Sequence, residues 1–373
     1  MTATRIGKLD SIALGVSLMM NSERLSWTYS IGLAIALLTP FASMGVASAA
    51  VQSKPPFALV SQIEIPHVPW GPYADHMAVD ISRHLLYVTP QAAHEVAVVS
   101  LNSHKVIRVI AGIKNPHSVY YSNRYNRLIV TDGGNGEIKF FNAKTLTLQK
   151  TISAPGADGL APDRSSHMVV ITYGGEDVGR RSCSVALVSV STAKEVGSIR
   201  VNSQELESPQ IDPVNNLLYI ELPRNDSTAV ISMSQKKVMA IWQLPKGRHP
   251  FASAIDSQRG LLFIGSRDTD MTGTVSVVDI HTGRLLTSAP IGSWVDSMTY
   301  DAQRKRLYLS TGVGYLDTFL VESPTHLVNL GAVPTAVMAK TSLYSSRLDL
   351  MFVMVPHLGD TPAKVLVFRP SRE

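Results

Sequence analysis

One sequence motif recurs through most of this chain: an aspartate, a short polar turn and a triplet of the Leu-Leu-Tyr type. It reads "DISRHLLYV" at 80–88 and "DAQRKRLYL" at 301–309. Alignment on the last residue of the triplet gives seven anchor positions, spaced 41 to 49 residues apart: Tyr87, Ile129, Val170, Tyr219, Phe263, Tyr308 and Phe352. A repeat of this period indicates an architecture built from stacked, similar units.

Each repeat predicts four short strands. Apolar and polar residues alternate on both sides of a polar turn in "EVAVVSLNSHKVIRVI" at 95–110 and again in "TVSVVDIHTGRLLTSA" at 274–289. Such a pattern is typical of a strand, a hairpin turn and a second strand. An inner strand leading into the aspartate turn and the strand carrying the anchor complete the unit. Helical periodicity is absent, and four strands in 40–45 residues is the period of a propeller blade.

Seven repeats predict an all-β fold, a seven-bladed β-propeller of four-stranded blades. The last repeat stops after its third strand, "AKVLVFRP" at 363–370. The segment "FALVSQIEIP" at 57–66 has the pattern of an outer strand with no blade before it. We therefore expect 57–66 to complete the last blade and close the ring, which leaves no open sheet edge. A single propeller domain is predicted over 50–373.

Two motifs resemble the YVTN-repeat, or YncE-like, family of exported bacterial β-propellers. "YVT" at 87–89 is close to the name motif, and "VVDIHTG" at 277–283 matches the family's Val-Ile-Asp-x-x-Thr-Gly hairpin. The resemblance covers 57–370 and implies the seven-bladed fold. Propellers of related type include lyases, lactonases, binding proteins and electron-transfer domains, so the resemblance implies no single activity and no catalytic residue.

The first 49 residues are predicted to be a signal peptide. The apolar run "WTYSIGLAIALLTPFASMGVASAA" at 27–50 follows Arg24 and contains Ala47-Ser48-Ala49, which fits cleavage after Ala49. Translation can start at Met1 or at Met20. The alternative is an uncleaved anchor, because the run is long enough to span a bilayer. We expect a periplasmic or secreted protein with no membrane contact after cleavage.

Charge, cysteine content and missing motifs exclude several classes of protein. The formal charge of +5 comes from scattered basic residues, without the aromatic-rich basic runs of nucleic-acid binding proteins. Cys183 is the only cysteine, so no intrachain disulfide can form and the core must hold the fold. Gly-x-Ser-x-Gly, His-Glu-x-x-His and Cys-x-x-Cys do not occur. The absence of these motifs weakens the interpretations as a serine hydrolase or a haem protein. Separately, we expect the protein to be a monomer.

The repeat register predicts a polar mouth for the central channel. Loops that enter the inner strands of a propeller share one face around this channel. Twelve residues before the anchor, four repeats carry a carboxylate: Asp75, Asp158, Glu207 and Asp296. The same position holds Lys340 in the last repeat, and the next position holds His76 and His117 in the first two. These seven residues, with His249 of "RHPFASAID", are the candidate ligand-binding residues.

The chemistry of this set leaves two interpretations open. The four carboxylates are candidate ligands for Ca²⁺ or Mg²⁺, because hard cations prefer oxygen ligands. His76 and His117 are candidate acid–base groups or ligands for a softer metal. The alternative is structural, since a carboxylate at the start of a strand can bind turn amides. We expect only this structural role for the aspartates seven residues before the anchors: Asp80, Asp163, Asp212, Asp256 and Asp301.

Two classes of function follow. The favoured one is a non-catalytic module that binds a small molecule or another exported protein through its channel face. The other is a metal-assisted lyase or hydrolase, lactonase-like, in which a cation polarises a carbonyl and a histidine moves the proton. The long loop "YGGEDVGRRSCS" at 173–184 is a candidate lid or partner contact in either case. Convergence of the carboxylates around His76 and His117 would favour the enzyme.

Overall fold

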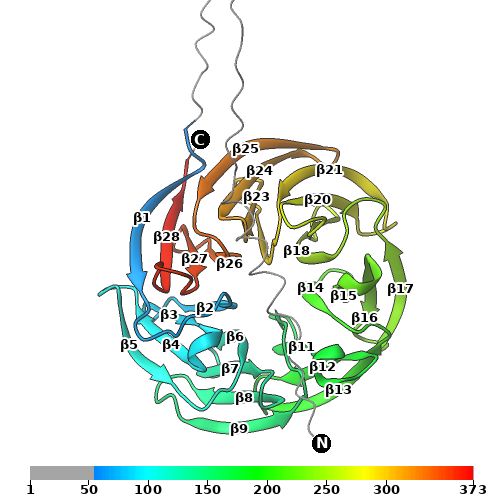
Figure 1. Cartoon of the computed structure of the whole chain (residues 1–373). Coiled ribbons are helices and arrows are strands. Elements are labelled where there is room, and N and C mark those ends of the chain that lie inside the picture. The colour runs from blue at the N-terminus through cyan, green and yellow to red at the C-terminus, as the bar shows by residue number, and fades with distance from the viewer. Residues whose placement is uncertain (1–53, 373) are drawn as a thin grey trace, which may run out of the picture. The chain divides into compact units, whose positions relative to one another are not determined.

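Seven four-stranded antiparallel sheets stand around a central axis in the computed structural model, which describes residues 54–372 (Figure 1). The prediction of an all-β, seven-bladed propeller is therefore confirmed. The predicted signal peptide, 1–49, lies outside the described residues. Within residues 54–372 no helix is long and apolar enough to cross a membrane.

The first four blades follow the chain from the inner to the outer strand. Blade 1 contains β2 (Met77–Asp80), β3 (Leu85–Val88), β4 (Val96–Ser100) and β5 (Lys105–Ile110). Blade 2 contains β6 (Pro116–Ser122), β7 (Arg127–Asp132), β8 (Glu137–Asn142) and β9 (Leu148–Ser153). Blade 3 contains β10 (Leu160–Asp163), β11 (Met168–Gly174), β12 (Cys183–Ser189) and β13 (Lys194–Val201). Blade 4 contains β14 (Glu207–Asp212), β15 (Leu217–Leu222), β16 (Ser227–Ser232) and β17 (Lys237–Gln243).

The last three blades complete the ring. Blade 5 contains β18 (Pro250–Asp256), β19 (Leu261–Ser266), β20 (Thr272–Asp279) and β21 (Leu285–Gly292). Blade 6 contains β22 (Ser297–Asp301), β23 (Arg306–Thr311), β24 (Tyr315–Ser323) and β25 (His326–Pro334). Blade 7 contains β26 (Thr341–Ser345), β27 (Leu350–Val355), β28 (Lys364–Pro370) and β1 (Phe57–Glu64). Three 3₁₀ turns lie in the loops: η1 (Gln91–Ala93), η2 (Glu176–Val178) and η3 (Pro223–Asn225).

Ring closure joins the two ends of the described chain within one blade. β1 pairs antiparallel with β28, with Phe57 opposite Pro370 and Glu64 opposite Lys364 (Figure 1). The strand predicted over 57–66 thus ends two residues earlier than expected. Phe57 is almost fully buried, and its ring centroid lies 4.8 Å from that of Tyr308 in blade 6. The closing strand is therefore held by packing between blades as well as by its ladder.

The repeated anchors form the core between neighbouring blades. All seven anchor residues have no exposed surface. Three of them contact a tyrosine on the inner strand of the next blade. The centroid distances are 6.0 Å for Tyr87–Tyr121, 5.1 Å for Phe263–Tyr300 and 5.3 Å for Tyr308–Tyr344. Aromatic pairs of this kind add roughly 0.5–1.5 kcal/mol each beyond the area that they bury, so each blade is fixed against the next.

The repeated aspartates close the turn between the first and second strands, as predicted. Asp80 accepts a hydrogen bond from the backbone N–H of Arg83 at 3.1 Å. Asp163 accepts from the N–H of Ser165 at 2.9 Å, and Asp256 accepts from that of Arg259 at 3.1 Å. These bonds satisfy amides that the strand ladder leaves without partners. The structure thus confirms that this repeated aspartate is a folding device.

Ring closure can be tested with two substitutions on β1. Phe57→Ala removes a buried ring that packs on Tyr308, so we expect a loss of about 3–5 kcal/mol in the free energy of unfolding. Leu59→Ala, on the same strand but 48% exposed, should change it by well under 1 kcal/mol. Urea unfolding measures both. Equal effects of the two substitutions would contradict the role of β1 as a closing strand.

Candidate functional site

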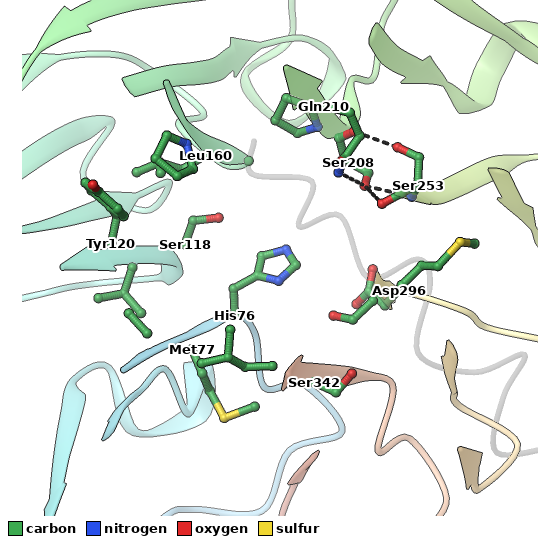
Figure 2. A pocket seen from close by; sticks show the side chains of 18 of the residues that line it. His76, Met77, Ser118, Tyr120, Leu160, Ser208, Gln210, Ser253, Asp296 and Ser342 are labelled. Atoms are coloured by element: carbon green, nitrogen blue, oxygen red, sulfur yellow. Dashed lines mark hydrogen bonds between the residues drawn. The ribbon is translucent and has the colours of Figure 1, made fainter. Parts of the chain in front are cut away.

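The seven inner strands enclose a cavity of about 330 Å³. Figure 2 shows His76 projecting into it from blade 1, with Asp296 on the opposite side. Serines from different blades also line it: Ser118, Ser208, Ser253, Ser297 and Ser342. Ser253 Oγ donates to the carbonyl oxygen of Ser208 at 2.9 Å. The hydroxyls of Ser118 and Ser297 have no hydrogen-bond partner within the described residues, so the cavity wall is polar.

Two of the four predicted carboxylates converge on one histidine at the channel mouth. The Nδ1 atom of His117 lies 3.0 Å from Oδ2 of Asp75 and 3.3 Å from Oδ1 of Asp158. Asp75 and Asp158 lie in the loops before the inner strands of blades 1 and 3, and His117 is the second residue of β6, the inner strand of blade 2. Within residues 54–372, this is the one group of three metal-ligand side chains whose donor atoms all lie within 4.8 Å of one another.

Neighbouring side chains and amides orient this cluster. The backbone N–H of His76 donates to Oδ1 of Asp75 at 2.9 Å, and Nε2 of Gln91 donates to Oδ2 of Asp75 at 3.2 Å. Gln91 Nε2 also lies 3.0 Å from His117 Nδ1. The other ring nitrogen of His117, Nε2, lies 2.8 Å from the side-chain amide of Asn115. The imidazole is thus held on both sides.

Backbone hydrogen bonds fix the loops that carry the cluster. The N–H of Asp75 donates to the carbonyl of Thr89, and the N–H of Asp158 donates to the carbonyl of Thr172, both at 3.0 Å. The N–H of His76 donates to the carbonyl of His117 at 3.2 Å, which ties blade 1 to blade 2. The cluster therefore sits on rigid parts of the scaffold.

The charged groups of the cluster shift one another's pKa values. Burial lowers the pKa of His117, but the nearby carboxylates of Asp158 and Asp75 outweigh it and raise the pKa to about 9. Burial raises the pKa of Asp158, and the charge of Asp75 raises it further, against the opposing effect of His117. The cluster therefore attracts positive charge, whether a proton or another cation.

Asp296 belongs to a second group on the other side of the mouth. Its Oδ1 accepts from Nη2 of Arg267 at 2.9 Å, and its Oδ2 pairs with Nζ of Lys340 at 2.7 Å. Burial raises the pKa of Asp296, but Lys340 and Arg267 outweigh it and lower the pKa to about 2. The guanidinium of Arg267 also lies 3.1 Å from the ring centroid of Phe251. Lys340, one of the candidate ligand-binding residues, is thus an ion-pair partner of Asp296.

Glu207 stands between the two groups without a partner. Its side chain lines the cavity, and within residues 54–372 it makes no hydrogen bond and no ion pair. Burial raises its pKa well above the ordinary value, and the charges of Asp158 and Asp296 raise it further. The four carboxylates therefore do not form one set: two meet at His117, one is neutralised by cations and one is free.

The remaining candidates lie nearby with other contacts. Nε2 of His76 is 3.5 Å from Oδ1 of Asp75 and the ring faces the cavity (Figure 2). The imidazole of His249 stacks on Phe251, with ring centroids 6.3 Å apart, and its backbone N–H donates to Asp226 at 2.7 Å. In the long loop, Glu176 pairs with Arg224 of blade 4.

Three residues of the site are not predicted from the sequence. Gln91 and Asn115 contact His117 directly, and Arg267 holds Asp296. Arg267 is followed by Asp268 and Asp270 in "RDTDMTG" at 267–273. A weak signal for all three exists: each lies in a loop on the same face as the register positions. Gln91 and Asn115 carry no repeat or motif that would single them out.

Comparison with known proteins supports the fold and leaves the family open. No family model and no curated protein matches this sequence, so the YVTN resemblance stays a prediction. A chain in "Crystal Structure of Mitotic Checkpoint Complex" superposes with a TM-score of 0.69 and 16% identity, covering 92% of this chain and 99% of that one. "Structure of U3-55K" gives 0.64 and 14%, covering 80% and 95%. "Crystal structure of RRP9 WD40 repeats" gives 0.64 and 14%, covering 80% and 94%. The shared feature is a WD40-like β-propeller fold.

A further carboxyl lies behind the site, sealed from solvent. Glu221 of β15 is directly opposite Glu207 in the ladder and has no exposed surface. Its Oε2 accepts from Thr228 Oγ1 at 2.6 Å, while Oε1 has no hydrogen-bond partner within residues 54–372. Burial raises the pKa of Glu221 from 4.5 to about 8. The folded protein therefore holds this carboxyl protonated near neutral pH.

This protonation makes stability depend on pH. Because the folded pKa lies above the unfolded one, the full stability is present below pH 4.5 and is lost as pH rises toward about 8. Glu221→Gln replaces the acid by a neutral group of the same shape. We expect the free energy of unfolding to fall between about pH 5 and pH 9 by a few kcal/mol more in the unsubstituted protein than in the variant. Identical pH profiles in urea unfolding would show that Glu221 is not buried in protonated form.

Proposed function

We propose that this protein is a non-catalytic binding module whose channel mouth and cavity hold a small polar ligand with a cationic group. The observation that carries the proposal is Glu207, a carboxyl that lines the cavity and has no partner within residues 54–372. The Glu207 side chain is half-buried and open to the cavity, so its oxygens can accept hydrogen bonds from a bound ligand.

The charge of the ligand follows from the surroundings of Glu207. Burial and the negative charges of Asp158 and Asp296 raise its pKa, so a free carboxylate there is unfavourable. An ammonium or guanidinium group placed beside it removes this cost, because opposite charges favour the ionised form. Asp158, whose side chain is 33% exposed, offers a second acceptor for the same group.

The size of the ligand follows from the cavity. A volume of about 330 Å³ falls at the lower end of small-molecule pockets. One neighbouring WD40-like propeller comes from a structure named for a complex, and protein binding is the broader reading that this likeness supports. The size of the cavity favours a small molecule. From the sequence of 1–49, we place the binding in the periplasm or outside the cell.

Binding fits the contacts of His117 better than proton transfer does. Its Nδ1 faces Asp75 and Asp158, and its Nε2 contacts Asn115. A general base needs a nitrogen that can reach the substrate, and both nitrogens of this ring are engaged. His76 faces the cavity and is the acid–base candidate that the lyase or hydrolase alternative retains (Figure 2).

Thermal unfolding with added amino acids tests the proposal. Lysine and arginine carry the predicted cationic group, and glutamate is the anionic comparison. A ligand present at a hundred times its Kd stabilises the folded state by about 2.7 kcal/mol, so we expect Tm to rise by a few degrees with lysine or arginine and not with glutamate. Glu207→Gln should abolish the rise, because it removes the acceptor charge.

Asp177→Asn provides the matched control. Asp177 carries the same charge in an exposed loop and makes no hydrogen bond or ion pair within the described residues. This variant should keep the rise in Tm. A rise that survives Glu207→Gln, or no rise with any of the three amino acids, would contradict the proposal.

A further inference from the structure

We propose that Asp75, His117 and Asp158 form a binding site for a first-row divalent metal ion of the Zn²⁺ type. The ligand atoms are Oδ2 of Asp75, Nδ1 of His117 and Oδ1 of Asp158. This set differs from the four carboxylates that the sequence indicates for Ca²⁺ or Mg²⁺. Glu207 is not part of this group, although the ligand proposed above shares Asp158 with it.

The spacing of the donor atoms fits a metal. Bonds of about 2.0–2.2 Å from Zn²⁺ to nitrogen and oxygen place neighbouring donors about 3.0–3.5 Å apart, for angles between 90° and tetrahedral. The observed separations from His117 Nδ1 are 3.0 Å to Asp75 and 3.3 Å to Asp158. The three donor atoms lie within 4.8 Å of one another. Both separations from Nδ1 therefore fall within the range that one bound ion requires.

The other atoms of the same side chains are already occupied. Oδ1 of Asp75 accepts from the N–H of His76, and Oδ2 faces His117. The amide of Gln91 contacts Oδ2 of Asp75 and Nδ1 of His117, so a metal ion there displaces Gln91 Nε2. Nε2 of His117 lies 2.8 Å from the side-chain amide of Asn115. When Nδ1 binds a metal, Nε2 carries the proton and donates it, so the Asn115 amide then presents its oxygen to the ring. Metal-binding histidines typically use their second nitrogen in this way, and such outer contacts set the ring orientation.

The backbone of the glycine-containing hairpin of blade 2 lies close to the imidazole of His117 and limits its position. A Cβ atom at Gly133 would lie 2.9 Å from His117 Nε2. The N–H of Gly133 also donates to the carbonyl of Asn115 at 3.0 Å. The sequence "TDGGNGE" at 131–137 thus serves more than a tight turn: it lets the backbone approach the ring. A preorganised ring loses little freedom when a metal binds.

A metal also accounts for the contacts better than a hydrogen bond does. One N–H on Nδ1 cannot point at Asp75 and Asp158 at the same time, whereas one ion can contact both. Asp158 accepts no side-chain hydrogen bond from any described residue and depends on His117 alone. The imidazole selects the metal, because Ca²⁺ and Mg²⁺ prefer all-oxygen ligands while Zn²⁺ readily takes nitrogen.

Calorimetric titration of the purified full chain with Zn²⁺ tests the site. We expect one equivalent to bind to the unsubstituted protein, and Ca²⁺ at the same concentrations not to bind. Asp158→Asn and His117→Gln should each weaken Zn²⁺ binding at least tenfold, because each removes a ligand. Asp177→Asn should leave it unchanged, since it removes a nearby negative charge that influences His117 but no ligand.

Thermal unfolding of the same samples separates loss of the site from loss of the fold. Asp158→Asn is expected to unfold at nearly the temperature of the unsubstituted protein without metal, and only the latter should gain stability from Zn²⁺. Unchanged Zn²⁺ affinity in Asp158→Asn and His117→Gln would overturn the proposal. So would the absence of a one-equivalent Zn²⁺ site in the unsubstituted protein, which would leave His117 as an ion-pair partner of the two aspartates.

Discussion

The antiparallel pairing of β1 with β28 is the constraint on which the rest of the structure depends. A propeller blade buries its faces only against two neighbours, so an incomplete last blade would expose blades 6 and 1 together. The outer strand of blade 7 comes from the start of the propeller, and Phe57 locks it against Tyr308. With the ring closed, seven inner strands converge at one mouth. That convergence brings residues more than two hundred positions apart in the chain around one cavity.

The charged residues at the channel mouth form two separate groups. Blades 1 to 3 supply Asp75, His117 and Asp158, which together favour a cation. On the other side, Asp296 is balanced by Arg267 and Lys340. A buried ion pair of this second kind contributes little net stability, but removing one partner leaves a charge uncompensated. Its role here is to hold Asp296 beside Arg267 and Lys340, away from Asp75 and Asp158. Glu207 and the His117 cluster are then the groups that attract a cation.

The repeat predicted the fold because every blade needs the same anchor and the same turn. Tyr87 and Tyr308 pack alike, and Asp80 and Asp163 bind turn amides alike, so period and register were readable. The register also placed the candidate site residues at the mouth. It could not reveal their partners, because side-chain direction and the contacts between blades vary from repeat to repeat. Asp75 and Asp296 occupy equivalent positions, yet one faces a histidine and the other two cations.

A crystal structure at about 1.2 Å resolution, where side-chain amides and protonation can be assigned with the least inference, tests the central claim most directly. The claim is that the register carboxylates split into two preorganised groups. The account predicts Asp75 and Asp158 within about 3.5 Å of His117 Nδ1, directly or through a shared metal ion, and Asp296 between Arg267 and Lys340. A mouth in which His117 turns away from both aspartates, or in which Asp296 leaves its cations to join them, would contradict it.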